Sequence, residues 1–188
     1  MRKLASAILL ALALAALWPA AQVHADSSLA VFGGWHFSHE GGGFDTLKGG
    51  AEYEWRAAVP LLSKIFEFAL ALPFTYYEAD PDIGAFRHVD VRVYSLIPTA
   101  KAYLTLIPAL HPYAGVGLGW ARSEFDEPVG ESEDGLAVRV IAGAEYVLFP
   151  ASPFLVFGEY EYTTLDLDEP RDLDLGGNAL LAGVRLRW

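Results

Sequence analysis

Hydrophobic and polar residues alternate along most of the chain, including its last nine residues. One series there is apolar and consists of Leu180, Ala182, Val184, Leu186 and Trp188. The residues between them are Leu181, Gly183, Arg185 and Arg187. Successive side chains of a β-strand point to opposite faces. The pattern therefore predicts a strand with one apolar face and one largely charged face.

The same alternation predicts eight strands, at residues 29–38, 47–59, 65–77, 89–106, 113–125, 136–149, 154–165 and 180–188. Long polar connectors alternate with short, proline-containing ones, as expected when one end of a barrel carries loops and the other carries turns. An even number of strands puts both chain ends at the turn end. Within the fourth segment, Pro98 predicts a bulge and a change of phase. Asp90 and Arg92 would then form its polar side before the proline, and Lys101 and Tyr103 after it.

An all-β chain of this kind suits either a membrane barrel or a soluble lipocalin-like or sandwich fold. In lipid every backbone polar group must be paired within the protein, so strands cross a bilayer only as a closed barrel. Aromatic residues at membrane interfaces gather near the two ends of the strands. The sequence predicts two such girdles, one of Trp35, Tyr76, Trp120 and Tyr162, the other of Tyr146, Phe149, Phe154 and Trp188. The girdles favour the membrane barrel.

Residues 1–25 have the features of a secretory signal peptide. Arg2 and Lys3 precede an apolar run from Leu4 to Leu17, and Val23-His24-Ala25 ends the segment with a small residue. The run is shorter than the roughly 20 residues of a membrane-spanning helix. We therefore expect cleavage after residue 25 and a single barrel domain over residues 26–188. The chain has no cysteine and a net charge of −11, which excludes disulfides and thiolate chemistry and disfavours nucleic-acid binding.

This arrangement resembles the small eight-stranded outer-membrane barrels, the OmpA transmembrane-domain and OmpX-like group. The resemblance covers 29–188 and includes PTAKAYL followed by HPYAGVGLGWARSEF. It implies an eight-stranded antiparallel up-and-down transmembrane β-barrel in the bacterial outer membrane. It also implies that Trp188, as a terminal aromatic residue, belongs to the signal read by the barrel-assembly machinery. Deleting Trp188 is expected to lower insertion in cells.

The polar strand faces predict a charge network inside the barrel, because an eight-stranded barrel is just wide enough for side chains to fill it. Its predicted acids are Glu52, Glu54, Glu67, Asp90, Glu145, Glu159 and Glu161. Its predicted bases are Arg56, Arg92, Lys101, Arg139, Arg185 and Arg187. Forked donors suit carboxylates on facing strands, so Arg56, Arg139 and Arg185 are the expected anchors. The excess acid then falls mainly in the loops after Phe125 and Leu165.

Catalytic and metal sites are also conceivable at a barrel mouth. His36 and Ser38 share a strand face, as in the His-x-Ser pair of eight-stranded lipid A deacylases, but parity puts them toward the lumen and no orienting glutamate can be assigned. His36, His39, Glu40 and His88 could meet near the loop end, next to a glycine run that is poorly preorganised for zinc. The acidic loops match no calcium-loop motif. We expect no enzyme, cofactor or metal.

These observations predict a non-enzymatic outer-membrane barrel that contributes to envelope integrity or presents surface loops to partners. A narrow channel for small hydrophobic molecules is the alternative, and a lipid A-modifying enzyme is a third class. Expected partners are outer-membrane lipid and lipopolysaccharide, together with periplasmic chaperones and the assembly machinery during biogenesis. No nucleic acid is expected, and the protein is expected to be a monomer.

Overall fold

A computed structural model describes residues 25–38, 45–57, 65–79, 91–125, 132–149, 152–167 and 176–188. These residues form nine strand segments: β1 (Ala25–Ser38), β2 (Asp45–Ala57), β3 (Phe66–Ala79), β4 (Val91–Leu96), β5 (Thr99–Leu104), β6 (Leu110–Phe125), β7 (Ser132–Val147), β8 (Phe154–Leu167) and β9 (Gly177–Arg187). The signal-peptide prediction and Asp90 lie outside the described residues. Among the described residues, no helix is long and apolar enough to cross a membrane.

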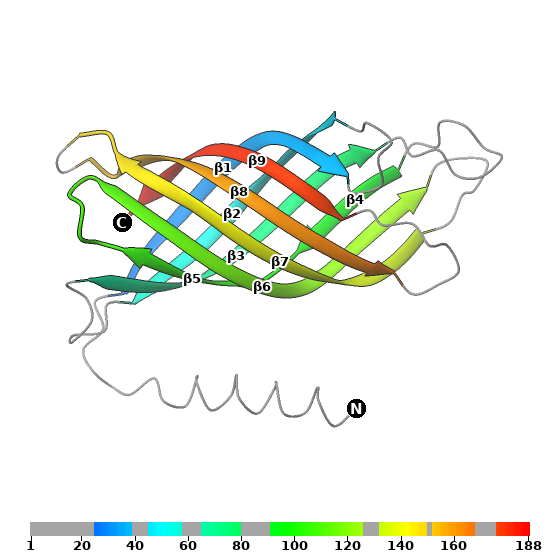
Figure 1. The fold of residues 1–188 in the computed structure, drawn as a ribbon, viewed down its shortest axis with the longest axis horizontal. Helices are drawn as coiled ribbons and strands as arrows, with labels where there is room; N and C mark the ends of the chain where they lie inside the picture. The colour runs from blue at the N-terminus through cyan, green and yellow to red at the C-terminus, as the bar shows by residue number, and fades with distance from the viewer. Residues whose placement is uncertain are drawn as a thin grey trace, which may run out of the picture.

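The strands close into an antiparallel barrel in which each strand pairs with its neighbours in sequence (Figure 1). Closure occurs between β1 and β9, where Val31 lies opposite Val184. Segments β4 and β5 both pair with β3 on one side and β6 on the other, so they are two halves of one strand. The prediction of eight antiparallel strands is confirmed.

The predicted bulge and phase change at Pro98 are wrong. Phe74 of β3 pairs with Leu96, and Ala71 pairs with Thr99, so three residues separate the two pairs on each strand. The register with β6 is equally continuous. Proline removes an N–H donor and interrupts the ladder without adding a residue. Odd-numbered residues therefore face the lumen on both sides of Pro98.

The outer surface carries a continuous apolar belt. On β3 the outward residues run from Phe66 through Phe74 to Tyr76 before the first charged one, Glu78. Ten residue steps at about 3.3 Å, tilted by about 40°, give a height of roughly 25 Å, which matches the apolar band of membrane barrels. Both predicted aromatic girdles face outward, and Trp35, Phe149 and Trp188 are more than half exposed.

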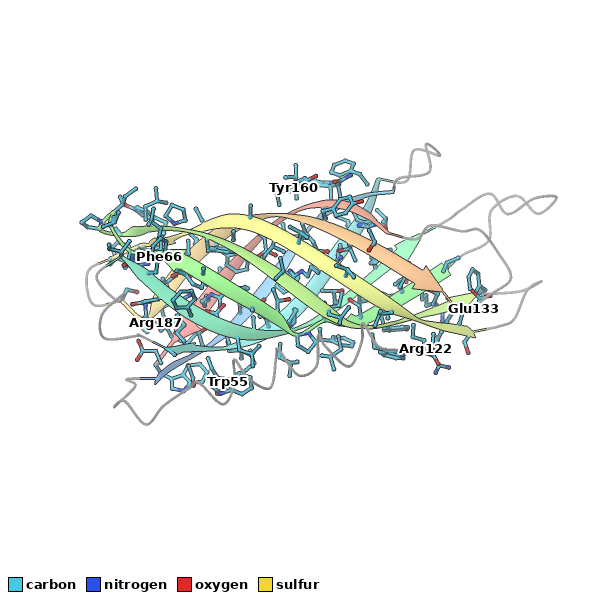
Figure 2. All side chains as sticks on the ribbon, turned by 60° about the horizontal axis from the view of Figure 1, so that its bottom comes forward. Trp55, Phe66, Arg122, Glu133, Tyr160 and Arg187 are labelled. Atoms are coloured by element: carbon cyan, nitrogen blue, oxygen red, sulfur yellow. The ribbon has the colours of Figure 1, made fainter. Side chains whose placement is uncertain are left out.

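The two ends of the barrel differ. We call the end where β1, β3, β6 and β8 finish the loop end, and the opposite one the turn end. Figure 2 shows Arg122 and Glu133 at the loop end, and Phe66, Trp55 and Arg187 toward the turn end. Where side chains are described, outward-facing charged residues occur only at the loop end: Glu78, Arg92, Arg122, Glu124 and Asp134. The apolar belt therefore extends to the turn end.

Candidate functional site: the ion-pair plug of the lumen

The middle of the lumen is filled by charged side chains. Within the described residues, ten buried charged side chains form ion pairs there, five acids and five bases. We call this group the plug. Its members are Glu52, Glu54, Glu145, Glu159, Glu161, Lys48, Arg56, Lys101, Arg139 and Arg185, each at most 5% exposed. The five negative and five positive charges cancel. The excess negative charge of the chain therefore lies outside the plug.

Arg56 is the anchor nearest the turn end. Its Nη1 and Nη2 donate to the two oxygens of Glu145 at 2.5 and 2.6 Å, and its Nε donates to Glu54 at 2.6 Å. The guanidinium carbon lies 3.9 Å from the ring centroid of Tyr103, whose hydroxyl donates to Glu54 at 2.7 Å. Three N–H groups of this arginine thus bind carboxylates, while its guanidinium lies over an aromatic ring.

Glu52 lies at the centre of the plug and receives donors from three strands. Lys101 Nζ lies 2.6 Å and Arg185 Nη2 2.8 Å from its Oε1, and Arg139 Nη1 lies 3.9 Å from its Oε2. Arg185 also reaches Glu54 at 3.1 Å and donates to Ser28 Oγ at 3.0 Å. The central carboxylate therefore ties β2 to β5, β7 and β9.

Arg139 joins the two acids of β8. Its Nη2 donates to Glu159 at 2.6 Å and its Nε to Glu161 at 2.7 Å. Glu161 is also paired with Lys48 and accepts from Thr163 Oγ1 at 2.8 Å. Consecutive inward residues of one strand, two apart, are thereby held by a single guanidinium from the neighbouring strand.

Tyrosines and small residues complete the packing. Tyr113 donates to Glu159 at 2.9 Å, and its ring centroid lies 4.9 Å from that of Tyr103. A Cβ added at Gly143 would come within 2.8 Å of the Tyr113 ring, and one at Gly117 within 2.5 Å of Thr99 Oγ1. Inward-facing glycines on β6 and β7 thus make room for bulkier neighbours.

The structure brings together nine of the thirteen predicted lumen residues in the plug. Glu67 and Arg187 also face inward, but they lie near the turn end, where Arg187 pairs with Asp26 at 2.5 Å and lies 3.9 Å from Glu67. The lumen position predicted for Arg92 is wrong, because β4 keeps its phase and Val91 and Val93 take the inward positions. Asp90 is outside the described residues.

Lys48 was missed by the sequence analysis. It lies inside the strand predicted at 47–59 and on the same face as Glu52, so applying the alternation from Leu47 onward would have found it. Tyr113 was missed in the same way, because it shares the parity of the β6 glycines. Its role as a donor to Glu159 carries no signal in the sequence.

The catalytic and metal hypotheses concern the loop end. His36 is buried in the lumen and stacks on Tyr77, with ring centroids 4.4 Å apart. The side chain of Ser38 is not described, and His39, Glu40 and His88 lie outside the described residues. Within the described part of the chain, no three His, Asp or Glu side chains are grouped to hold a metal ion.

Comparison with known proteins gives structural neighbours and no sequence relatives. No protein-family model matches the chain, and no curated protein matches it. Ail, the attachment invasion locus protein of Yersinia pestis, is 17% identical with a TM-score of 0.62, covering 87% of this chain and 98% of its own. Neisserial surface protein A is 16% identical with a TM-score of 0.59, covering 87% and 97%.

The N-terminal β-barrel domain of Pseudomonas aeruginosa OprF is 19% identical with a TM-score of 0.54, covering 89% of this chain and 100% of its own. The fold is that of the small eight-stranded outer-membrane barrels. At identities below 20%, these similarities establish the fold alone. The residues of the plug are described from this chain alone.

Proposed function

We propose that this chain is an integral barrel of the bacterial outer membrane that acts without catalysis, supporting the envelope and presenting its loop end to partners. The observation that carries the proposal is the combination of an apolar belt outside with a charge-balanced plug inside. A filled lumen does not offer a path for solutes, and an apolar exterior requires lipid. The remaining accessible polar surface lies at the two ends.

Fractionation of cells that express the chain tests this proposal. The mature protein, cleaved after residue 25, is expected in the outer-membrane fraction and to migrate differently on gels with and without boiling. A closed barrel resists unfolding by detergent until it is heated, which is the reason for the shift. Recovery as a soluble periplasmic protein without a heat-dependent shift would contradict the proposal.

Biogenesis and lipid contacts belong to the same proposal. Trp188 faces outward, 60% exposed, with its ring centroid 6.3 Å from that of Tyr53, so lipid can contact it in the folded barrel. We propose that the assembly machinery reads Trp188 before insertion. At the other end, Arg92 and Arg122 alternate with outward acids above the belt. This mixture suits the phosphates of lipopolysaccharide and the divalent ions that accompany them. We infer a monomer that contacts lipid around its circumference.

The absence of enzymatic activity is part of the proposal. Eight-stranded deacylases expose a His-x-Ser pair to lipid, whereas His36 here is buried inside the barrel against Tyr77. Lipid A from cells with and without the protein is expected to have identical mass spectra. A loss of acyl chains that depends on His36 would establish the enzymatic alternative.

A further inference from the structure

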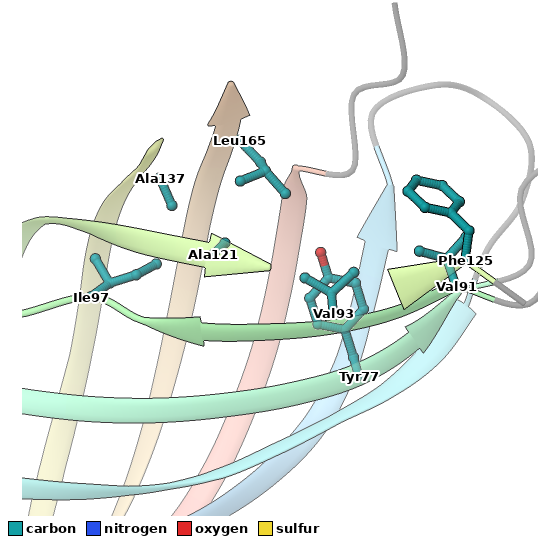
Figure 3. Close-up of a cluster of buried hydrophobic side chains, with 8 residues drawn as sticks. All are labelled: Tyr77, Val91, Val93, Ile97, Ala121, Phe125, Ala137 and Leu165. Carbon is teal, nitrogen blue, oxygen red and sulfur yellow. The ribbon is translucent and has the colours of Figure 1, made fainter. Parts of the chain in front are cut away.

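Between the plug and the loop end, many of the inward side chains are apolar. They form a cluster of Tyr77, Val91, Val93, Ile97, Ala121, Phe125, Ala137 and Leu165 (Figure 3). The cluster is contributed by β3, β4, β6, β7 and β8 and by the link between β4 and β5. The plug lies beneath it: toward the turn end, Arg139 is the next inward residue after Ala137 on β7, and Glu161 follows Leu165 and Thr163 on β8.

The lining also contains hydrogen-bonded polar side chains, such as Thr75 and Ser95, whose hydroxyls lie 2.6 Å apart. Two further polar side chains, Ser123 and Glu133, differ from these. Ser123 lies opposite Val93 on β4 and opposite Glu133 on β7, and Val93 lies opposite Tyr77. Tyr77, Val93, Ser123 and Glu133 therefore form one inward-facing row across four strands. Ser123 is 0% exposed, and its hydroxyl has no hydrogen-bond partner in the described part of the chain. The Oε2 atom of Glu133 is also buried without a partner.

This pair contrasts with every acid of the plug. Each plug carboxylate has at least one cation within 2.8 Å, whereas Glu133 forms no ion pair with any residue that the structure describes. Of the described bases, the two nearest by position are paired with other groups. Lys48 is paired with Glu161, and Arg122, on the opposite face of β6, reaches Glu124 at 3.3 Å and donates to Ser132 at 3.1 Å.

The chemistry of the missing partner follows from these groups. An ionised carboxylate only accepts hydrogen bonds, and a serine hydroxyl accepts as well as donates. Buried polar atoms without partners are rare in folded proteins, and a positively charged donor would satisfy both the Ser123 hydroxyl and the buried Oε2 of Glu133, whose side chain is partly exposed. Val93, Ile97 and Leu165 supply apolar surface in the same part of the lumen, so the rest of such a molecule would also be apolar.

We propose that the loop-end lumen binds a small organic cation, with a primary ammonium group on Glu133 and Ser123 and an apolar body against Val93, Ile97 and Leu165. Below the pair, the inward residues of β7 before Arg139 of the plug are the small Gly135 and Ala137. The plug closes the site toward the turn end. The ligand therefore enters and leaves at the loop end and is not transported through the barrel.

Nuclear magnetic resonance of the refolded barrel in phosphocholine nanodiscs tests the proposal, with benzylammonium as the probe. Saturable shifts are expected at the backbone amides of Ser123, Glu133 and Gly135. Benzyl alcohol, which has the same body without charge, is expected to bind at least tenfold more weakly, and benzoate not at all. Glu133→Gln is expected to raise the Kd of benzylammonium at least tenfold.

Glu124→Gln is the matched control, because Glu124 is a neighbouring carboxylate on the outer face and is paired with Arg122. It is expected to leave the Kd unchanged. Ser123→Ala, which preserves the acid, is expected to weaken binding about threefold and serves as a second variant if Glu133→Gln does not refold. The proposal is overturned by equal binding of benzyl alcohol, by an unchanged Kd in Glu133→Gln, or by the absence of saturable shifts in the wild type.

Discussion

The arginines of the plug use their forked donors in different ways. Arg56 binds both oxygens of one carboxylate, that of Glu145, whereas Arg139 spans two carboxylates on the neighbouring strand. Lysine is a point charge and could replace neither geometry. Each arginine therefore fixes the distance and the rotation between the side chains that it joins, in addition to neutralising them.

Arg139→Ala is expected to destabilise the barrel by about 3–5 kcal/mol, because it leaves Glu159 and Glu161 with an uncompensated buried charge. Arg139→Lys is expected to recover only part of this loss. Urea unfolding in lipid vesicles, followed by tryptophan fluorescence, measures the change. Arg122→Ala is the control: this arginine is 40% exposed on the outer face, and its loss is expected to cost about 1 kcal/mol or less. Equal stability of Arg139→Ala and wild type would show that the plug does not stabilise the fold.

Thr99 supports the wall where prolines interrupt it. The Thr105 N–H donates to the Ile65 carbonyl at 2.9 Å, so Ile65 and Thr105 are a hydrogen-bonded pair of the ladder. In an antiparallel ladder every second pair is hydrogen-bonded. Counting along β3 from Ile65 makes the position where Pro73 lies opposite Ile97 another such pair. Pro73 has no N–H to donate. The Thr99 hydroxyl instead donates to the Ile97 carbonyl at 2.7 Å and lies 3.4 Å from Arg139 Nη1.

Thr99→Val is expected to destabilise the barrel by about 1–3 kcal/mol, because the carbonyl of Ile97 then loses its donor inside the wall. Thr99→Ser keeps the hydroxyl and is expected to stay within about 0.5 kcal/mol of wild type. Amide hydrogen exchange separates this effect from general loosening. Faster exchange is expected on β4, β5 and β6, and uniform exchange around the whole barrel would argue against a local role.

At the scale of a strand, inward glycines set how closely neighbouring strands accommodate large rings. Gly183 of β9 lies opposite Phe157 of β8 and Phe32 of β1. A Cβ built at Gly183 would lie 2.6 Å from the Phe157 ring and 2.5 Å from the Val31 carbonyl oxygen. At Gly158, which faces outward on β8, the nearest atom would be 4.0 Å away.

Gly183→Ala is therefore expected to destabilise the barrel by about 1–3 kcal/mol through overpacking at the closing strand pair. Gly158→Ala adds the same methyl group toward lipid and is expected to be neutral within about 0.5 kcal/mol. Unfolding midpoints of the two refolded variants provide the measurement. A Gly183→Ala variant as stable as Gly158→Ala would mean that the β8–β9–β1 wall yields to the added group.

The alternation of apolar and polar residues predicted which side chains face the lumen on almost every strand. A shift of one residue in a strand would exchange its lumen face and its lipid face, so the pattern is strongly constrained. It failed on β4, where Val91 and Val93 face the lumen and Arg92 faces outward. Apolar residues do not mark the outer face there, because this part of the strand lies above the apolar belt. Its inward residues belong instead to the apolar cluster at the loop end. The error at Pro98 followed from that assignment, since a phase change was needed to bring Lys101 inside.

At the scale of the whole molecule, the composition of the lumen was more predictable than its contacts. Strand parity gave Glu52, Lys101 and Arg185 a common interior. Which of them meet depends on the stagger between strands around the closed barrel, and β2, β5 and β9 are not sequence neighbours. The pairing of Glu52 with two cations from opposite walls therefore required the three-dimensional register.

Closure of the lumen by the plug leads to the last prediction. The wild type reconstituted in planar bilayers is expected to show no steady ion conductance. The double replacement Arg185→Ala with Glu54→Ala removes a fully buried pair at 3.1 Å and keeps the charge balance, so water is expected to enter and discrete conductance events to appear. Arg187→Ala with Asp26→Ala removes a partly exposed pair near the turn end and is expected to leave the bilayer silent. Steady current through the wild type, or equal current through both double variants, would show that the plug is not the barrier and would favour a channel.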